Sequence, residues 1–133
     1  MELENVLYGG VQLVHNFGAA AVIGLPVAAL RLQPAPSTLR KMAWLTLVAW
    51  LAQAASGAGF GTVSFLMEGE LPQIHHVALG ALCVKIGCAA LAVTLLSVRF
   101  LRHSAKQSTA MWSWLAVLGA TALSAAAVLR WFS

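Results

Sequence analysis

Residues 73–98 read QIHHVALGALCVKIGCAALAVTLLSV, and this stretch decides the fold class of the chain. Lys85 is its only residue with a fixed charge, and most of the others are Ala, Leu, Val, Ile or Gly. A helix that crosses a bilayer needs about 20 mainly apolar residues, so the stretch predicts a transmembrane helix. The paired histidines at its start and the lysine in its middle are costly in hydrocarbon, which makes them candidate functional residues.

Three more segments, residues 6–30, 42–67 and 111–131, have the same apolar character. The chain has 133 residues, is 60% hydrophobic and 9% charged, and has a mean hydropathy of +0.83. A soluble domain is about 25% charged, and a chain this short cannot bury so much apolar surface in a globular core. We therefore predict an all-α integral membrane protein, in which residues 1–133 form a single four-transmembrane-helix bundle without a soluble appendage.

The charged residues outside these segments predict the orientation of the bundle. Most bases lie in the links 31–41 and 99–109, whereas all four acids lie at the N-terminus or in the link 68–72. Cytoplasmic links carry an excess of Lys and Arg, so the two basic links are predicted to be cytoplasmic. Both termini then face the outer, periplasmic side of a bacterial inner membrane, with Arg130 as the one base on the opposite side. The net charge of +4 is thus explained by topology and does not indicate nucleic acid binding.

Three of the four histidines fall in the predicted outer half of the membrane. At about 1.5 Å per residue, His75 and His76 lie about 5 Å from Pro72, and His15 lies about 14 Å inside its own segment. Imidazole is the commonest metal ligand, binds haem iron and suits copper. We predict that His15 and His76 form one metal or haem-iron site, with His75 as an auxiliary ligand. The alternative for His75 and His76 is that they are interfacial residues wetted by lipid headgroups. Possible accessory residues are Met67, Glu68, Glu70, Lys85 and Gln12.

The helical repeat predicts which way His76 faces. At about 100° per residue, His76 shares a stripe with small residues, namely Gly80, Cys83, Gly87 and Ala90. Small residues let membrane helices approach closely, so this stripe is predicted to face a neighbouring helix. His15 also shares its stripe with small and polar residues, which predicts that it points inward. Cys83 and Cys88 point to different faces, so we predict two small buried packing residues rather than a disulfide.

Lys85 lies on the side of its helix opposite His76, close to the predicted middle of the membrane. No acid lies within the apolar segments to neutralise it. We predict that Lys85 makes a polar contact inside the bundle, with Gln53 and Ser56 as possible partners.

Two of the segments resemble a known family. LVHNFGAAAVIGLPVAAL (13–30) resembles the first core helix of the CopD copper-resistance family, in which a histidine is followed by small residues and a glycine. HHVALGALCVKIGCAALAVTLLSVRF (75–100) is similar to another CopD helix, in which a glycine, a lysine and an Ala- and Leu-rich run end at a base. The resemblance covers under half of the chain, and CopD proteins are generally longer, with more helices. It implies an inner-membrane protein that handles copper, often beside a periplasmic copper-binding partner. The matching positions are His15, Gly24, Gly80, Lys85 and Arg99.

Two other functions remain open at this point. The first is a b-type haem subunit with bis-histidine ligation that passes electrons between quinol and a partner, although His15 and His76 differ by about 8 Å in nominal depth. The second is a structural subunit of a larger membrane complex or a homo-oligomer, for which Gly57 and Gly61 supply a helix-packing motif. The chain has no phosphate-binding loop, no dinucleotide fingerprint and no Asp. Whether it is an enzyme is therefore left undecided.

Overall fold

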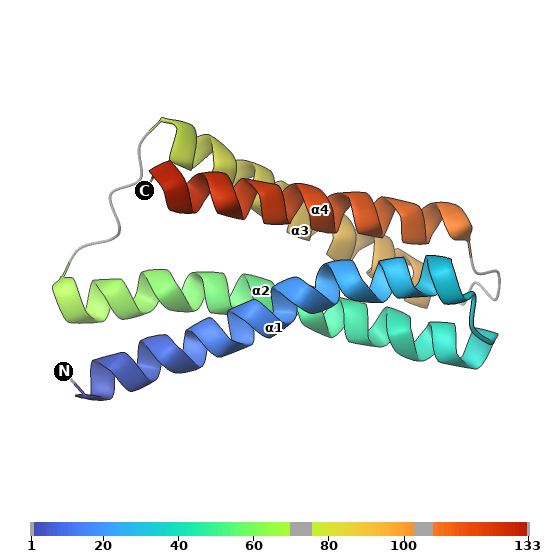
Figure 1. The fold of residues 1–133 in the computed structure, drawn as a ribbon, viewed down its shortest axis with the longest axis horizontal. Helices are drawn as coiled ribbons and strands as arrows, with labels where there is room; N and C mark the ends of the chain where they lie inside the picture. The colour runs from blue at the N-terminus through green and yellow to red at the C-terminus, as the bar shows by residue number, and fades with distance from the viewer. Residues whose placement is uncertain (1, 70–75, 103–107, 133) are drawn as a thin grey trace.

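The computed structural model describes residues 2–69, 76–102 and 108–132 (Figure 1). In this part of the chain four helices form: α1 (Glu2–Leu32), α2 (Pro36–Glu68), α3 (Val77–Leu101) and α4 (Thr109–Phe132). Each of them is long and apolar enough to cross a membrane. The prediction of an all-α four-helix bundle is confirmed, whereas the side of the membrane that the termini face remains a prediction.

Local sequence signals explain both ends of α2. The helix begins at Pro36, before the predicted apolar segment, because proline is preorganised for the first helical position. It ends at Glu68 and is capped by Gly69, which has a left-handed φ of 75° and donates its backbone N–H to the Phe65 carbonyl at 3.0 Å. Glycine takes this conformation without steric cost, which is why it commonly terminates helices.

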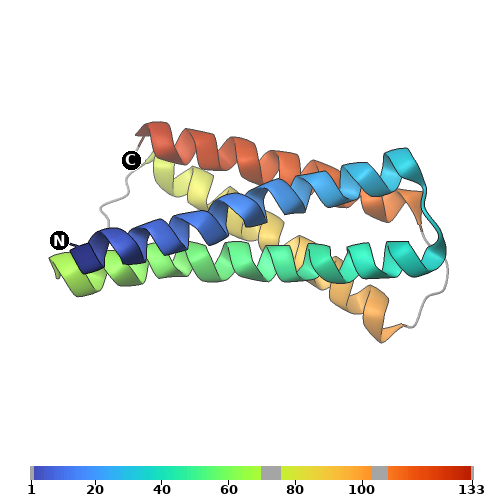
Figure 2. The same ribbon diagram turned by 60° about the horizontal axis from the view of Figure 1, so that its bottom comes forward.

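The four helices pack as two antiparallel pairs that cross each other (Figures 1 and 2). α1 packs against α2 and α4, and α3 packs against α4 and α2, so α1 and α3 are diagonal partners. Both termini lie at one end of the bundle, here called the terminal end (Figure 1). The opposite end, here called the basic end, carries Arg31, Arg40, Lys41, Arg99 and Arg102.

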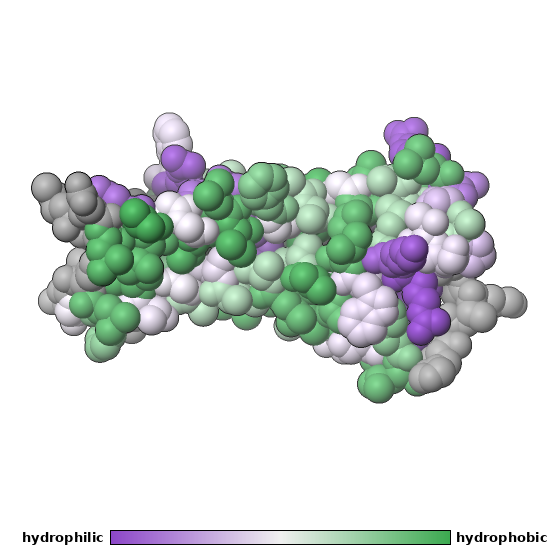
Figure 3. Space-filling view, turned by 90° about the horizontal axis from the view of Figure 1, so that it is seen from below, coloured by the Kyte–Doolittle hydropathy of each residue, from purple (hydrophilic) through white to green (hydrophobic). Residues whose placement is uncertain are grey.

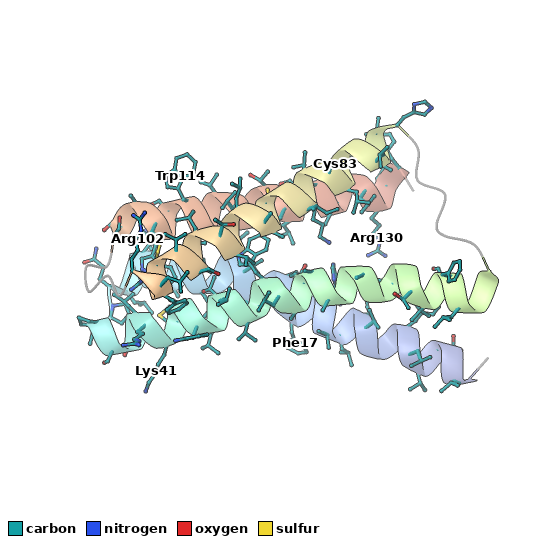
Figure 4. All side chains as sticks on the ribbon, turned by 180° about the vertical axis from the view of Figure 1, so that it is seen from behind. Phe17, Lys41, Cys83, Arg102, Trp114 and Arg130 are labelled. Carbon is teal, nitrogen blue, oxygen red and sulfur yellow. The ribbon has the colours of Figure 1, made fainter. Side chains whose placement is uncertain are left out.

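The face of the bundle in Figure 3 is mainly apolar along the middle of the helices, with hydrophilic side chains nearer the two ends. Phe17 on α1 and Trp114 on α4 are 74% and 61% exposed and project outward (Figure 4). The interior contains many small residues, such as Ala43 and Ala92, which let the helices approach closely. An apolar outer surface around an interior rich in small residues is the arrangement expected of a bundle whose solvent is lipid.

The face that α3 buries differs from the one predicted. Gly80, Cys83, Gly87 and Ala90 are exposed, so the prediction that this stripe faces a neighbouring helix is wrong. The prediction that both cysteines are buried is wrong for Cys83 and confirmed for Cys88, and neither forms a disulfide. The buried residues of α3 are Ala78, Ala81, Cys88, Ala92 and Leu96.

The physical reason lies in Lys85, which belongs to the buried stripe at the helical repeat of about 3.6 residues. This second stripe is also made largely of small residues, so it allows an equally close helix approach. Turning it inward takes the lysine out of the lipid, whereas the predicted orientation would have exposed it.

Candidate functional site at His15

His15 on α1 lies at the junction of three helices. Its Nδ1 atom is 2.8 Å from Ser56 Oγ on α2, and its Nε2 atom is 3.0 Å from Lys85 Nζ on α3. Because α1 and α3 are diagonal, the contact between His15 and Lys85 crosses the interior of the bundle. The prediction that His15 points inward is confirmed by these contacts.

The hydrogen bonds around Ser56 determine the tautomer that fits His15. Ser56 is 6% exposed, and its hydroxyl donates to the Ala52 carbonyl at 2.7 Å. A charged lysine has only donors, so His15 Nε2 accepts from Lys85. The proton of the neutral imidazole then resides on Nδ1, which donates to Ser56 Oγ. In this arrangement each polar atom of the chain from Lys85 to Ala52 has a partner of the right kind.

Two neighbours on α2 fix the position of His15. The Gln53 side-chain amide donates to the His15 backbone carbonyl, and Phe60 meets the imidazole edge-on with ring centroids 5.5 Å apart. Gly18 permits this arrangement, because a Cβ atom there would lie 2.8 Å from Gln53 Nε2. A larger residue at position 18 would therefore push the amide away from His15.

A polar seam continues from His15 toward the terminal end between α1 and α2. Tyr8 bonds Ser64 through their hydroxyl groups at 3.1 Å, and its ring stacks on Phe60 at 6.5 Å. This seam was not predicted from the sequence. Its signal is present, since Ser56, Phe60 and Ser64 recur at the spacing that puts residues on one helical face.

Lys85 makes the polar contact inside the bundle that was predicted for it. Its partner is the imidazole of His15. The two expected partners both contact His15 instead, Ser56 at the imidazole and Gln53 at the backbone carbonyl. The direct pairing was not predicted, because Gln53 or Ser56 was the expected partner and His15 was assigned to a separate site with His76.

The structure does not bring His76 to His15. His76 precedes α3 and is exposed, with a positive φ of 45°. From position 76 to position 85 the helix advances about 13 Å at about 1.5 Å per residue, and Lys85 is the residue that reaches His15. The described geometry therefore centres the site on His15 and Lys85.

The remaining predicted residues contribute no described contact to this site. Gln12 is exposed and donates to Asn16 within α1 at 2.9 Å. His75 and Glu70 lie outside the described residues, as do the side chains of Met67 and Glu68. Within the described part of the chain, no three residues of the types His, Cys, Asp and Glu form a cluster that could hold a metal.

A cavity of about 230 Å³ lies far from His15, at the basic end between Leu30, Leu39 and Trp112.

Comparison with known proteins adds no assignment, since no protein-family description, curated protein or solved structure matches this chain. Any functional conclusion thus has to rest on the chemistry of the residues themselves.

Proposed function

We propose that this chain is a CopD-like membrane protein that handles copper through His15, with Lys85 as a second nitrogen donor. The observation that carries the proposal is the 3.0 Å separation between His15 Nε2 and Lys85 Nζ in the bundle interior. Two nitrogens that bind one ion at about 2.0–2.1 Å are roughly 3 Å apart when they are adjacent ligands. The distance between His15 Nε2 and Lys85 Nζ would therefore also let both nitrogens bind the same metal ion.

The donor chemistry favours copper over harder metals. Imidazole and amine nitrogens suit copper, whereas magnesium, calcium and manganese prefer carboxylate and carbonyl oxygens. The two nitrogens come from diagonal helices, and no acidic residue occurs in the apolar segments. Ser56 supports ligation by holding the Nδ1 proton, which leaves the Nε2 lone pair directed at Lys85.

A site with two protein nitrogens suits transfer better than storage. Closed structural metal sites usually have four protein ligands, whereas a two-donor site leaves positions open for an exchanging ligand. A charged lysine cannot donate a lone pair, so metal binding requires Lys85 to release a proton. In this role the protein would exchange copper with a soluble copper-binding partner at the terminal end, the side predicted to be periplasmic.

Bis-histidine haem ligation has less support from the geometry. The imidazoles of His15 and His76 do not face each other in the described structure, and Nε2 of His15 already has Lys85 as its neighbour.

The test is copper binding by the purified protein in detergent, measured by competition with a chelating dye and by metal analysis. The wild type should retain copper and His15→Ala should lose it. Lys85→Leu removes one of the two donor nitrogens and should weaken binding by at least the factor of about 10–100 that loss of a mere supporting group costs. Lys41→Leu is the matched control, because Lys41 projects away from the bundle and should not affect binding (Figure 4).

His76→Ala decides between the two possible sites. Retention of copper by this variant supports the His15–Lys85 site, and a loss equal to that of His15→Ala supports the site predicted from the sequence. A haem signal in the reduced-minus-oxidised spectrum of the same sample would identify haem, and not copper, as the bound cofactor. A wild-type protein that holds neither group would leave only the structural-subunit function.

A further inference from the structure

A second site lies at the basic end, where α2 and α3 each carry an arginine and an aromatic residue within one helical turn of sequence. Arg99 near the end of α3 lies close enough to Arg40 of α2 for the two positive charges to repel each other. Trp44 follows Arg40 by one helical turn, and its ring stacks on Phe100 with centroids 4.4 Å apart. Two cations and two stacked rings thus occur together where the two helices meet.

The two guanidinium groups have no counter-charge in the described structure. Arg99 donates from Nη1 to Met111 Sδ at 3.7 Å, a weak acceptor. Neither arginine has a carboxylate partner within residues 2–69, 76–102 and 108–132. All four acids of the chain lie at the N-terminus or in the link 68–72, so none belongs to the sequence around the basic end. Two like charges held together in this way are stabilised by a bound anion.

We propose that this surface, formed by Arg40, Arg99, Trp44 and Phe100, binds the headgroup of an anionic phospholipid. Arginine matches phosphate oxygens with its planar fork of donors, so two arginines can hold one phosphate. Basic pockets between transmembrane helices are known to take such headgroups. Arg102 lies one turn beyond Arg99 and adds a third positive charge at the same end.

The surroundings indicate a lipid rather than a free phosphate ion. Trp44 is 50% exposed, and tryptophan is enriched where hydrocarbon meets headgroups. Figure 3 shows hydrophilic side chains at this end directly beside the apolar surface of the helices. A lipid could place its phosphate on the arginines and an acyl chain along this apolar surface, whereas inorganic phosphate would gain only the first contact.

Native mass spectrometry of the full-length protein tests the site, with phosphatidylglycerol and phosphatidylcholine of identical acyl chains as ligands. The wild type should retain phosphatidylglycerol preferentially. Arg40→Gln and Arg99→Gln should each weaken its binding about fivefold, the usual effect of one base near an anionic lipid surface. Arg31→Gln is the matched control, because it removes the same charge from the same end but outside the site, and should leave binding unchanged.

Three results would overturn the proposal. Equal weakening by Arg31→Gln would show a general attraction to the basic end, and equal retention of phosphatidylcholine would show that the headgroup charge is not recognised. Displacement of the lipid by glycerol phosphate at equal concentration would show an anion site without lipid specificity. Arg40 is exposed, so Arg40→Gln keeps the test decisive even if Arg99→Gln disturbs the fold.

Discussion

Lys85 and His15 each reduce the cost of placing the other inside the membrane. A charged side chain at the centre of a bilayer costs about 2.5–3.5 kcal/mol on insertion scales. The imidazole gives the ammonium group an acceptor at 3.0 Å, and Ser56 gives the opposite ring nitrogen a partner at 2.8 Å. A neutral histidine therefore serves where a carboxylate would be expected, and the lysine is retained without a buried acid.

The hydroxyl of Ser56 should contribute measurably to stability through this chain of contacts. Ser56→Ala leaves the Nδ1 proton of His15 without its acceptor, and an unsatisfied buried donor costs about 1–3 kcal/mol. Hydrogen bonds between membrane helices average nearer to about 0.6 kcal/mol. We expect the free energy of unfolding to fall by about 1 kcal/mol, measured by circular dichroism in mixed detergent micelles.

Ser124→Ala is the matched control for this measurement. Ser124 is exposed, and its hydroxyl donates only within α4, to the Ala120 carbonyl at 2.9 Å. Its removal should leave the unfolding free energy unchanged. Equal losses in the two variants would mean that Ser56 acts through its own helix rather than through His15.

Between elements, the contact of α1 with α4 depends on a proline and a glycine. Pro26 has no N–H to donate to the Val22 carbonyl one turn earlier, which leaves that oxygen without its usual helical partner. Gly119 of α4 lies against this carbonyl, and a Cβ atom at position 119 would be 2.8 Å from the oxygen. The two helices approach so closely because position 119 has no side chain.

Gly119→Ala should therefore destabilise the bundle. The added methyl would lie 2.8 Å from the Val22 carbonyl oxygen and 3.2 Å from Ile23 Cγ1. Because the nearer atom belongs to the backbone, α1 and α4 must separate. Overpacking of this kind costs about 1–3 kcal/mol. Unfolding in mixed micelles should show that loss for Gly119→Ala.

Gly87→Ala provides the comparison, because Gly87 is exposed and an added methyl there would have no neighbouring atom within 4 Å. Alanine is the better helix former by up to about 1 kcal/mol, so this variant should be neutral or slightly stabilised. If Gly119→Ala were equally well tolerated, the close approach of α1 to α4 would not be needed for stability.

Across the whole molecule, charge is distributed unequally between the two ends. Five bases lie on the described residues of the basic end, namely Arg31, Arg40, Lys41, Arg99 and Arg102, whereas Glu2, Glu4 and Glu68 lie in the helix turns nearest the terminal end. Moving one positive charge outward against a membrane potential of about 100 mV costs about 2.3 kcal/mol. The basic end should therefore face the cytoplasm.

Cysteine labelling in intact cells tests this orientation. In a variant without Cys83 and Cys88, Ser37→Cys should be shielded from impermeant reagents, because Ser37 lies in the first turn of α2 at the basic end. Asn5→Cys near the N-terminus should be labelled from outside. The reverse pattern would place the terminal end in the cytoplasm and the lipid site in the outer leaflet.

The number of helices, their apolar character and the inward direction of His15 could all be predicted from the sequence. Hydropathy over about 20 residues and the repeat of one helix are local properties, and they do not depend on the neighbours. The polar contact of Lys85 was also predictable, because a lysine in the middle of an apolar segment needs a partner whatever the topology.

The rotation of α3 could be decided only by the tertiary structure. This helix has two stripes of small residues, one on the same face as His76 and one that contains Lys85. Both stripes allow close packing against a neighbouring helix. The first was predicted to face inward because its residues are small. In the folded bundle α1 and α3 are diagonal, which brings Lys85 to His15 and leaves His76 exposed. The relative rotation of helices depends on all four packing together, and burial of the single lysine determines which stripe faces inward.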